Sequence, residues 1–115
     1  MASIEALGYI TLAIFAFTAA VQMVMWGLAA LGAHYTAEHA AQTTRLYGSS
    51  AAAGREDATT MLDSTVGVAL ADAHPTVTRT AATVTVTITG HAVTVVPGLR
   101  PPVTVTVTVP VERIN

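Results

Sequence analysis

The sequence predicts an α+β fold with a long N-terminal transmembrane and amphipathic helix, a second short helix and a small antiparallel β-sheet. Three observations support this. Residues 6–33 contain no charged side chain, and helical spacing of apolar residues returns within 54–74. Valine or isoleucine alternates with threonine over 83–89 and again over 103–109. The chain is short enough for one small head beside a single membrane span.

The uncharged run is long enough to cross a membrane. At about 1.5 Å per residue it forms a helix of roughly 40 Å, against a hydrocarbon core of about 30 Å. A secretory signal peptide, cleaved near Gly32 to release a β-rich protein, is the main alternative, but no basic segment precedes the run. We therefore predict a transmembrane helix over 1–33, its juxtamembrane continuation over 34–48, and a small α+β head over 49–115.

Small residues recur along the predicted span at Gly8, Ala16, Ala20 and Gly27. The four-residue spacing of Ala16 and Ala20 allows two helices to approach closely in a membrane. We expect helix packing at these four positions. The alternative is that alanine is simply abundant throughout this chain.

Beyond the span the helical pattern continues as an amphipathic helix. A narrow stripe of small side chains occupies one face, and polar residues take the other positions. The members of this alanine stripe are Ala33, Ala37, Ala40, Ala41 and Thr44. Gly48 is the predicted end of the helix, because glycine tolerates the left-handed conformation that often follows a last turn.

A second helix is predicted from Gly54 to the residue before Pro75. Glu56 and Asp57 lie in its first turn, where the helix dipole favours acids. Proline disfavours a helical conformation in the residue before it, so Pro75 marks the end. The apolar positions with helical spacing are Ala58, Met61, Leu62, Val66, Ala69 and Leu70.

The strands follow from β-branched residues with a period of two. Strict alternation over 83–89 and 103–109 directs aliphatic side chains to one face and hydroxyls to the other. A shorter strand is expected at 77–79, and residues 93–96 are expected to extend the sheet. Val96-Pro97-Gly98-Leu99 has the sequence of a type II turn. The second helix or the alanine stripe is expected to cover the aliphatic face.

Composition argues against several kinds of function. The chain has no cysteine, which excludes disulfides and thiolate metal sites. Its five basic residues are scattered arginines and its net charge is −2, so nucleic acid is not an expected partner. No glycine-rich phosphate loop follows a strand and serine is scarce, so residues for nucleotide binding and for nucleophilic catalysis are lacking. We therefore expect no enzyme, no catalytic residue and no cofactor.

His34, Glu38 and His39 are the one group that suggests a metal site. Their pattern differs from the His-Glu-x-x-His motif, and the neighbours Glu38 and His39 point about 100° apart on a helix. A solvated helix face next to the membrane is the preferred interpretation. No metal is expected.

Three segments, in this order along the chain, carry a resemblance to a known family. They are the start Ala2-Ser3-Ile4-Glu5, the helix segment Ala40-Ala41-Gln42-Thr43-Thr44-Arg45 with Tyr47-Gly48, and the tail motifs Thr76-Val77-Thr78-Arg79-Thr80, Val96-Pro97-Gly98-Leu99 and Pro110-Val111-Glu112-Arg113. Together they resemble TadE-like pilus-assembly proteins of the actinobacterial type, minor pilin-like subunits of tight-adherence pili. The resemblance implies a pilin-like or pseudopilin fold, a part in a type IV-like pilus, and a link to cell adhesion.

The resemblance gives Glu5 and Met1 an assembly role. Pilin-like families have a basic leader that a prepilin peptidase removes after a glycine, and a glutamate at the fifth mature position. Glu5 matches that position if Met1 is the first mature residue, although no leader or glycine precedes it. The chain is then either a processed form or one that escapes the peptidase.

Physical chemistry supports such a role for Glu5. A carboxylate within an apolar helix costs about 2.5–3.5 kcal/mol at mid-span and less near the surface. The α-amino group of a neighbouring subunit would neutralise it and favour staggered packing of the helices. The simpler alternative is an acid in contact with water at the membrane interface.

Two functional hypotheses follow. The first is a single-pass membrane subunit that assembles into a pilus with other pilin-like subunits and the assembly machinery. The resemblance then implies a cytoplasmic N-terminus and an extracytoplasmic head at the cell membrane. The second is a membrane-anchored binding module whose β-rich head recognises a partner or ligand, with no pilus role.

Overall fold

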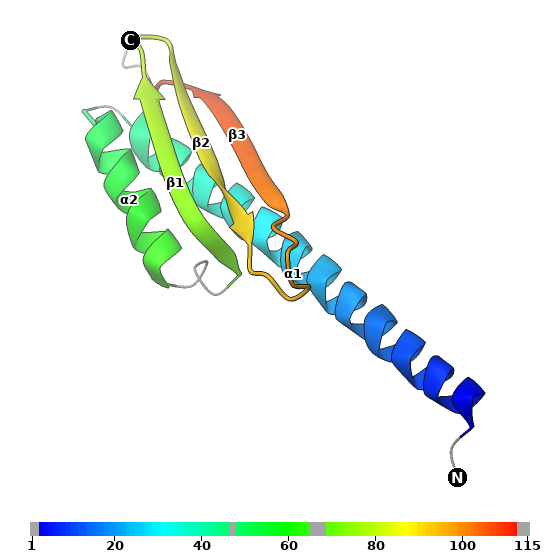
Figure 1. Cartoon of the computed structure of the whole chain (residues 1–115). Helices are drawn as coiled ribbons and strands as arrows, with labels where there is room; N and C mark the ends of the chain where they lie inside the picture. The colour runs from blue at the N-terminus through cyan, green and yellow to red at the C-terminus, as the bar shows by residue number, and fades with distance from the viewer. Residues whose placement is uncertain (1–2, 47, 65–68, 113–115) are drawn as a thin grey trace.

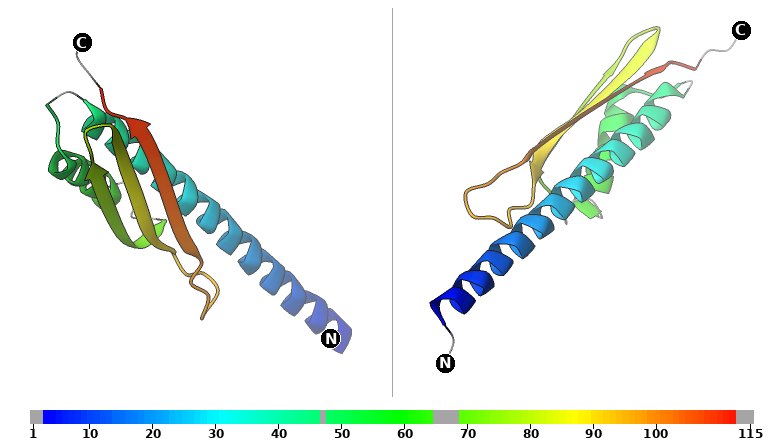
Figure 2. Two further views of the ribbon diagram at one scale, coloured as in Figure 1. Left: turned by 90° about the horizontal axis from the view of Figure 1, so that it is seen from above. Right: turned by 90° about the vertical axis from the view of Figure 1, so that its right-hand side faces the viewer.

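The computed structural model describes residues 3–46, 48–64 and 69–112, and it has the predicted α+β layout (Figure 1). The elements in chain order are α1 (Ile4–Arg45), α2 (Ala51–Ser64), β1 (Leu70–Arg79), β2 (Thr83–Ala92) and β3 (Pro102–Pro110). The strands form one antiparallel sheet in the order β1-β2-β3. The sheet and α2 pack on the C-terminal half of α1, and its N-terminal half projects beyond them (Figures 1 and 2). The molecule is therefore elongated, with extents of 79 × 20 × 18 Å.

The first helix ends slightly earlier than predicted. Its last residue is Arg45 and Leu46 is extended, so the helix stops before Gly48, whose φ is +81°. The carbonyl of Arg45 accepts a hydrogen bond from the N–H of Glu112 at 2.8 Å. The carbonyl of Leu46 accepts one from Nη2 of Arg79 at 3.3 Å. Contacts with distant parts of the head thus satisfy these two carbonyls at the helix end.

The second helix begins before the predicted residue Gly54. Ser50 precedes its first turn, and Oγ of Ser50 accepts a hydrogen bond from the N–H of Ala53 at 3.2 Å. Serine is a favoured cap at this position, because its hydroxyl satisfies an amide that has no partner within the helix. Gly54 therefore lies inside α2 and is buried there.

The predicted C-terminal part of the second helix is wrong. Leu70 begins β1, where it pairs with Ala92 of β2, and Pro75 lies within the same strand opposite Ile88. β1 is an edge strand, where the missing N–H of proline can face away from the ladder. The predicted helical position Val66 lies outside the described residues.

The alternating strands are confirmed and are longer than predicted. Val84, Val86 and Ile88 of β2 are fully buried. The threonines between them face outward, and the hydroxyls of Thr85 and Thr108 lie 3.4 Å apart across β2 and β3. The period of two therefore determined both the strands and the face that each side chain takes.

The segment between β2 and β3 corrects one prediction and confirms another. Residues 93–96 are not a strand but the first part of a loop. The type II turn is present: the N–H of Leu99 donates to the carbonyl of Val96 at 3.1 Å. The φ of Gly98 is +83°, as the third residue of such a turn requires.

Both predicted covers of the aliphatic face are used. Helix α1 packs against β2 and β3, and α2 packs against β1 on the same side of the sheet (Figure 2). Short side chains allow the sheet to lie close to α1. All five residues of the alanine stripe are fully buried: Ala33, Ala37, Ala40, Ala41 and Thr44.

Thr36 gives a first testable prediction about this packing. It is fully buried on α1, and its Oγ1 has no hydrogen-bond partner among the described residues. Thr36→Val keeps the shape of the side chain and removes a buried, unsatisfied hydroxyl. We expect the free energy of unfolding in urea, measured in detergent, to rise by about 1 kcal/mol.

Thr44→Val is the matched control. Thr44 is equally buried, but its Oγ1 donates to the carbonyl of Ala40 at 2.7 Å. Its replacement should lower the free energy of unfolding by about 1 kcal/mol. Equal losses in the two variants would contradict the prediction for Thr36.

Candidate functional site

The N-terminal half of α1 exposes large apolar side chains on all sides. Eight of them are between 55% and 89% exposed: Ile4, Leu7, Tyr9, Ile10, Leu12, Ile14, Phe15 and Phe17. Within the described part of the chain, α1 is the one helix long and apolar enough to cross a membrane. Lipid is an environment in which such a surface is stable.

Glu5 lies at the free end of this apolar helix. Ser3 caps the helix, since its Oγ accepts a hydrogen bond from the N–H of Ala6 at 3.0 Å. Glu5 is exposed in the first turn, where the helix dipole favours an acid, and its Oε1 accepts a hydrogen bond from the Tyr9 hydroxyl at 3.2 Å. Met1, its predicted partner position, lies outside the described residues. The assembly role of both residues stays a prediction.

The four predicted packing positions are accessible. Gly8, Ala16, Ala20 and Gly27 are all exposed. A Cβ added at Gly8 or Gly27 would meet no atom within 4 Å. At 100° per residue, Ala16, Ala20 and Gly27 share one side of α1, while Gly8 lies roughly 100° away. The head leaves this surface free for another helix, and packing there remains a prediction.

A second exposed surface lies beside the head. Val24, Leu28, Leu31 and Tyr35 follow one another at helical spacing, and we call them the outer stripe. They are 50–66% exposed. By helical geometry they face away from the buried alanine stripe, so the head covers the opposite side of α1. Large apolar side chains therefore continue along the helix past the start of the head.

Gln22 connects α1 to the loop between β2 and β3, a role that the sequence analysis missed. It is 3% exposed. Its Nε2 donates to the carbonyl of Val93 at 3.1 Å. Its Oε1 accepts from the N–H groups of Val95 at 2.7 Å and Val96 at 3.0 Å. The one sequence feature that could have indicated this role is a single amide side chain inside a long uncharged run.

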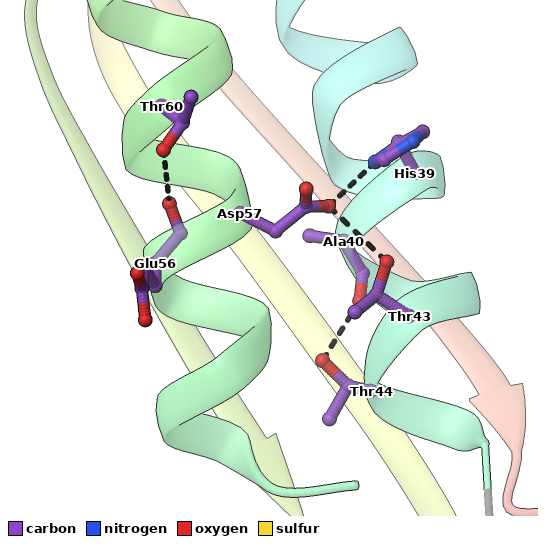
Figure 3. A network of polar contacts seen from close by, with 7 residues as sticks. All are labelled: His39, Ala40, Thr43, Thr44, Glu56, Asp57 and Thr60. Carbon is purple, nitrogen blue, oxygen red and sulfur yellow. Dashed lines mark hydrogen bonds and ion pairs between the residues drawn. The ribbon is translucent and has the colours of Figure 1, made fainter.

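The helix face after the span is polar and partly solvated. Nε2 of His34 lies 3.2 Å from Oε1 of Glu38, and both side chains are more than half exposed. His39 instead turns toward α2, where its Nδ1 lies 2.5 Å from Oδ2 of Asp57. Oγ1 of Thr43 donates to the same Oδ2 at 3.2 Å (Figure 3). Asp57 thus joins α2 to α1.

The acidic and histidine side chains of the described residues do not gather at one place. The described part of the chain contains no group of three His, Asp or Glu side chains arranged to hold a metal ion. A shallow hollow between α2 and β1 includes Asp63 and Asp72 in its lining. Asp72 already pairs with Arg100, whose Nη2 lies 2.8 Å from its Oδ2, and both side chains are more than 60% exposed.

Comparisons with protein-family models, with curated proteins and with solved structures found no match. The resemblance to TadE-like proteins therefore rests on the sequence motifs alone and stays a prediction. The candidate functional site is the surface of α1 itself: its apolar N-terminal half, Glu5 and the outer stripe.

Proposed function

We propose that this protein is a pilin-like subunit, inserted in the cell membrane by one span, that helps to assemble a tight-adherence, type IV-like pilus. It does so by packing α1 against the helices of other pilin-like subunits. In this proposal the N-terminus is cytoplasmic and the head extracytoplasmic. The observation that carries it is the outer stripe, an apolar helix surface beyond the length that a bilayer needs.

In this proposal the lipid-embedded part of α1 is shorter than the span predicted over residues 1–33. Residues 4–21 lie before the head and make about 27 Å of helix, close to the roughly 30 Å of a hydrocarbon core. The outer stripe begins after them, level with the head. The head's exposed threonines and the exposed Asp72–Arg100 pair belong in water, so the lipid core does not cover the stripe.

A simple membrane anchor would have no use for this surface. Helix surface outside the bilayer is normally polar, and contiguous exposed apolar surface marks interaction sites. From Glu38 onward the exposed side of α1 is indeed polar, with His39 and Gln42. The stripe therefore supports a helical protein partner in preference to an anchored binding module.

Glu5 supports the same proposal from the other end of the helix. It is an exposed carboxylate next to side chains suited to lipid. Pairing with the α-amino group of an adjacent subunit would remove the cost of bringing this charge into a helix bundle. Such pairing would also fix the axial position of one subunit relative to the next.

The test is Glu5→Ala in the native host, compared with Glu38→Ala. We expect Glu5→Ala to abolish surface pili, seen by electron microscopy, while membrane fractionation still recovers the protein in full. Glu38→Ala changes an exposed acid on the same helix beyond the span and should leave piliation normal. Normal pili with Glu5→Ala would contradict the assembly role and favour the anchored binding module.

A further inference from the structure

The loop between β2 and β3 is apolar without belonging to the core. Between Val93 and Leu99 it contains no charge, and Thr94 is its one polar side chain. Neither the buried core nor the partly buried hydrophobic residues packed against it include any residue of this loop. Leu99 is 46% exposed, whereas the three valines of the loop are partly buried. Folding of the head alone gives no reason for this composition.

Several backbone groups of the loop are hydrogen-bonded to other protein groups. Gln22 binds one carbonyl and two N–H groups of the loop, as described above. The N–H of Val93 donates to the carbonyl of Ala69 at 2.9 Å, and that of Leu99 to the carbonyl of Val96. Backbone groups exposed to water can bind water molecules and do not need protein partners. Irregular backbone near lipid does need them, because lipid tails offer no hydrogen bonds.

The position of the loop matches the membrane boundary. Of the whole head, it reaches furthest toward the N-terminal end of α1 in both views of Figure 2. Its backbone joins α1 at Gln22, directly after the roughly 27 Å of helix in residues 4–21. The turn at Pro97-Gly98 thus lies at the level where hydrocarbon gives way to headgroups.

Two groups next to this turn limit how deeply it can enter the bilayer. Trp26 is 45% exposed, and its Nε1 donates to the carbonyl of Pro102 at 3.0 Å. An indole with an apolar body and a satisfied N–H suits the membrane interface. Arg100, the next residue of the loop after Leu99, forms an exposed ion pair with Asp72, and this pair belongs on the water side.

We infer that residues 93–99 form a second membrane contact, a turn whose exposed residues Pro97, Gly98 and Leu99 enter the interface of the lipid bilayer beside the span. Gln22 holds this turn against α1 and so fixes the head at one height and tilt. The inference rests on the membrane span of the proposed function but not on the pilus role.

The test uses the full chain, whose lack of cysteine allows one label at a time. Leu99→Cys, Ala81→Cys and Phe15→Cys are each labelled with the fluorophore NBD in vesicles of phosphatidylcholine and phosphatidylglycerol. Ala81 is an exposed residue of the hairpin at the opposite end of the sheet, and Phe15 lies in the span. Emission wavelength and quenching by lipids with nitroxides at two depths are measured.

We expect the Leu99 label to emit at shorter wavelength than the Ala81 label and to be quenched most by the shallow nitroxide. The Phe15 label should be quenched most by the deep one. A Leu99 label as aqueous as that at Ala81, with Phe15 in lipid, overturns this inference and leaves the span intact. An aqueous Phe15 label overturns the span and this inference together.

Discussion

Replacing Gly54 by alanine is expected to lower the free energy of unfolding of the head by on the order of 3 kcal/mol. Gly54 lies on the side of α2 that packs against α1. A Cβ built there would lie 1.7 Å from Oγ1 and 3.1 Å from Cβ of Thr44, and 3.2 Å from Cγ1 of Val77. Thr44 is fully buried, so it cannot move aside without displacing α2.

Urea unfolding in detergent, followed by the fluorescence of Trp26, measures this loss. Gly27→Ala is the matched control, because an added Cβ there meets nothing within 4 Å. It should leave stability unchanged or raise it by up to about 1 kcal/mol through helix propensity.

A double-mutant cycle identifies the clash as the cause. Thr44→Ala removes the Oγ1 that the new methyl group would strike. The pair Thr44→Ala with Gly54→Ala should therefore be less destabilised than the two single changes added together, by 1 kcal/mol or more. Strict additivity, or a Gly54→Ala variant as stable as the original chain, would refute close packing at this position.

Patterns that repeat along the chain predicted most of the fold. Strict alternation in β2 and β3 gave both strands and their buried faces, because each pleated residue has only two directions to point. The alanine stripe predicted which face of α1 is covered, because small residues at helical spacing let another layer approach closely. These features depend on neighbours in sequence.

Features that depend on distant residues were predicted poorly. Leu70 fits a helical period, yet its pairing with Ala92 of β2 makes it a strand residue. The sequence predicts a helix start at Gly54, whereas the structure places Gly54 inside α2, where a Cβ would clash with Thr44 of α1. A short apolar segment is compatible with either secondary structure until its tertiary partner is known.

The candidate site also has parts that the sequence predicted and parts that only the packing reveals. The apolar half of α1 and Glu5 were visible in the sequence as an uncharged run and a single acid. The sequence alone does not distinguish the outer stripe from the membrane span. Only the packing of the head shows which face of the helix stays uncovered. The role of Gln22 depends on a loop more than 70 residues away in the sequence, so its position in an apolar helix does not predict it.

Gln22→Met is expected to release the loop between β2 and β3 from α1. Methionine has nearly the shape of glutamine but cannot bind the carbonyl of Val93 or the N–H groups of Val95 and Val96. Removing these partly buried hydrogen bonds should cost about 1–3 kcal/mol locally. Hydrogen exchange by mass spectrometry should then show amides of the loop exchanging about ten- to a hundredfold faster.

The rest of the sheet should keep its protection, because β2 remains paired with β1 and β3 on both sides. Gln42→Met provides the control: it is the other glutamine of α1, it is exposed, and its Oε1 accepts only from Nη1 of Arg45 among the described residues. Exchange in the loop should not change in that variant. Faster exchange throughout β2 in Gln22→Met would mean that Gln22 supports the whole head, whereas unchanged exchange in the loop would mean that the loop is held by its own turn and strands.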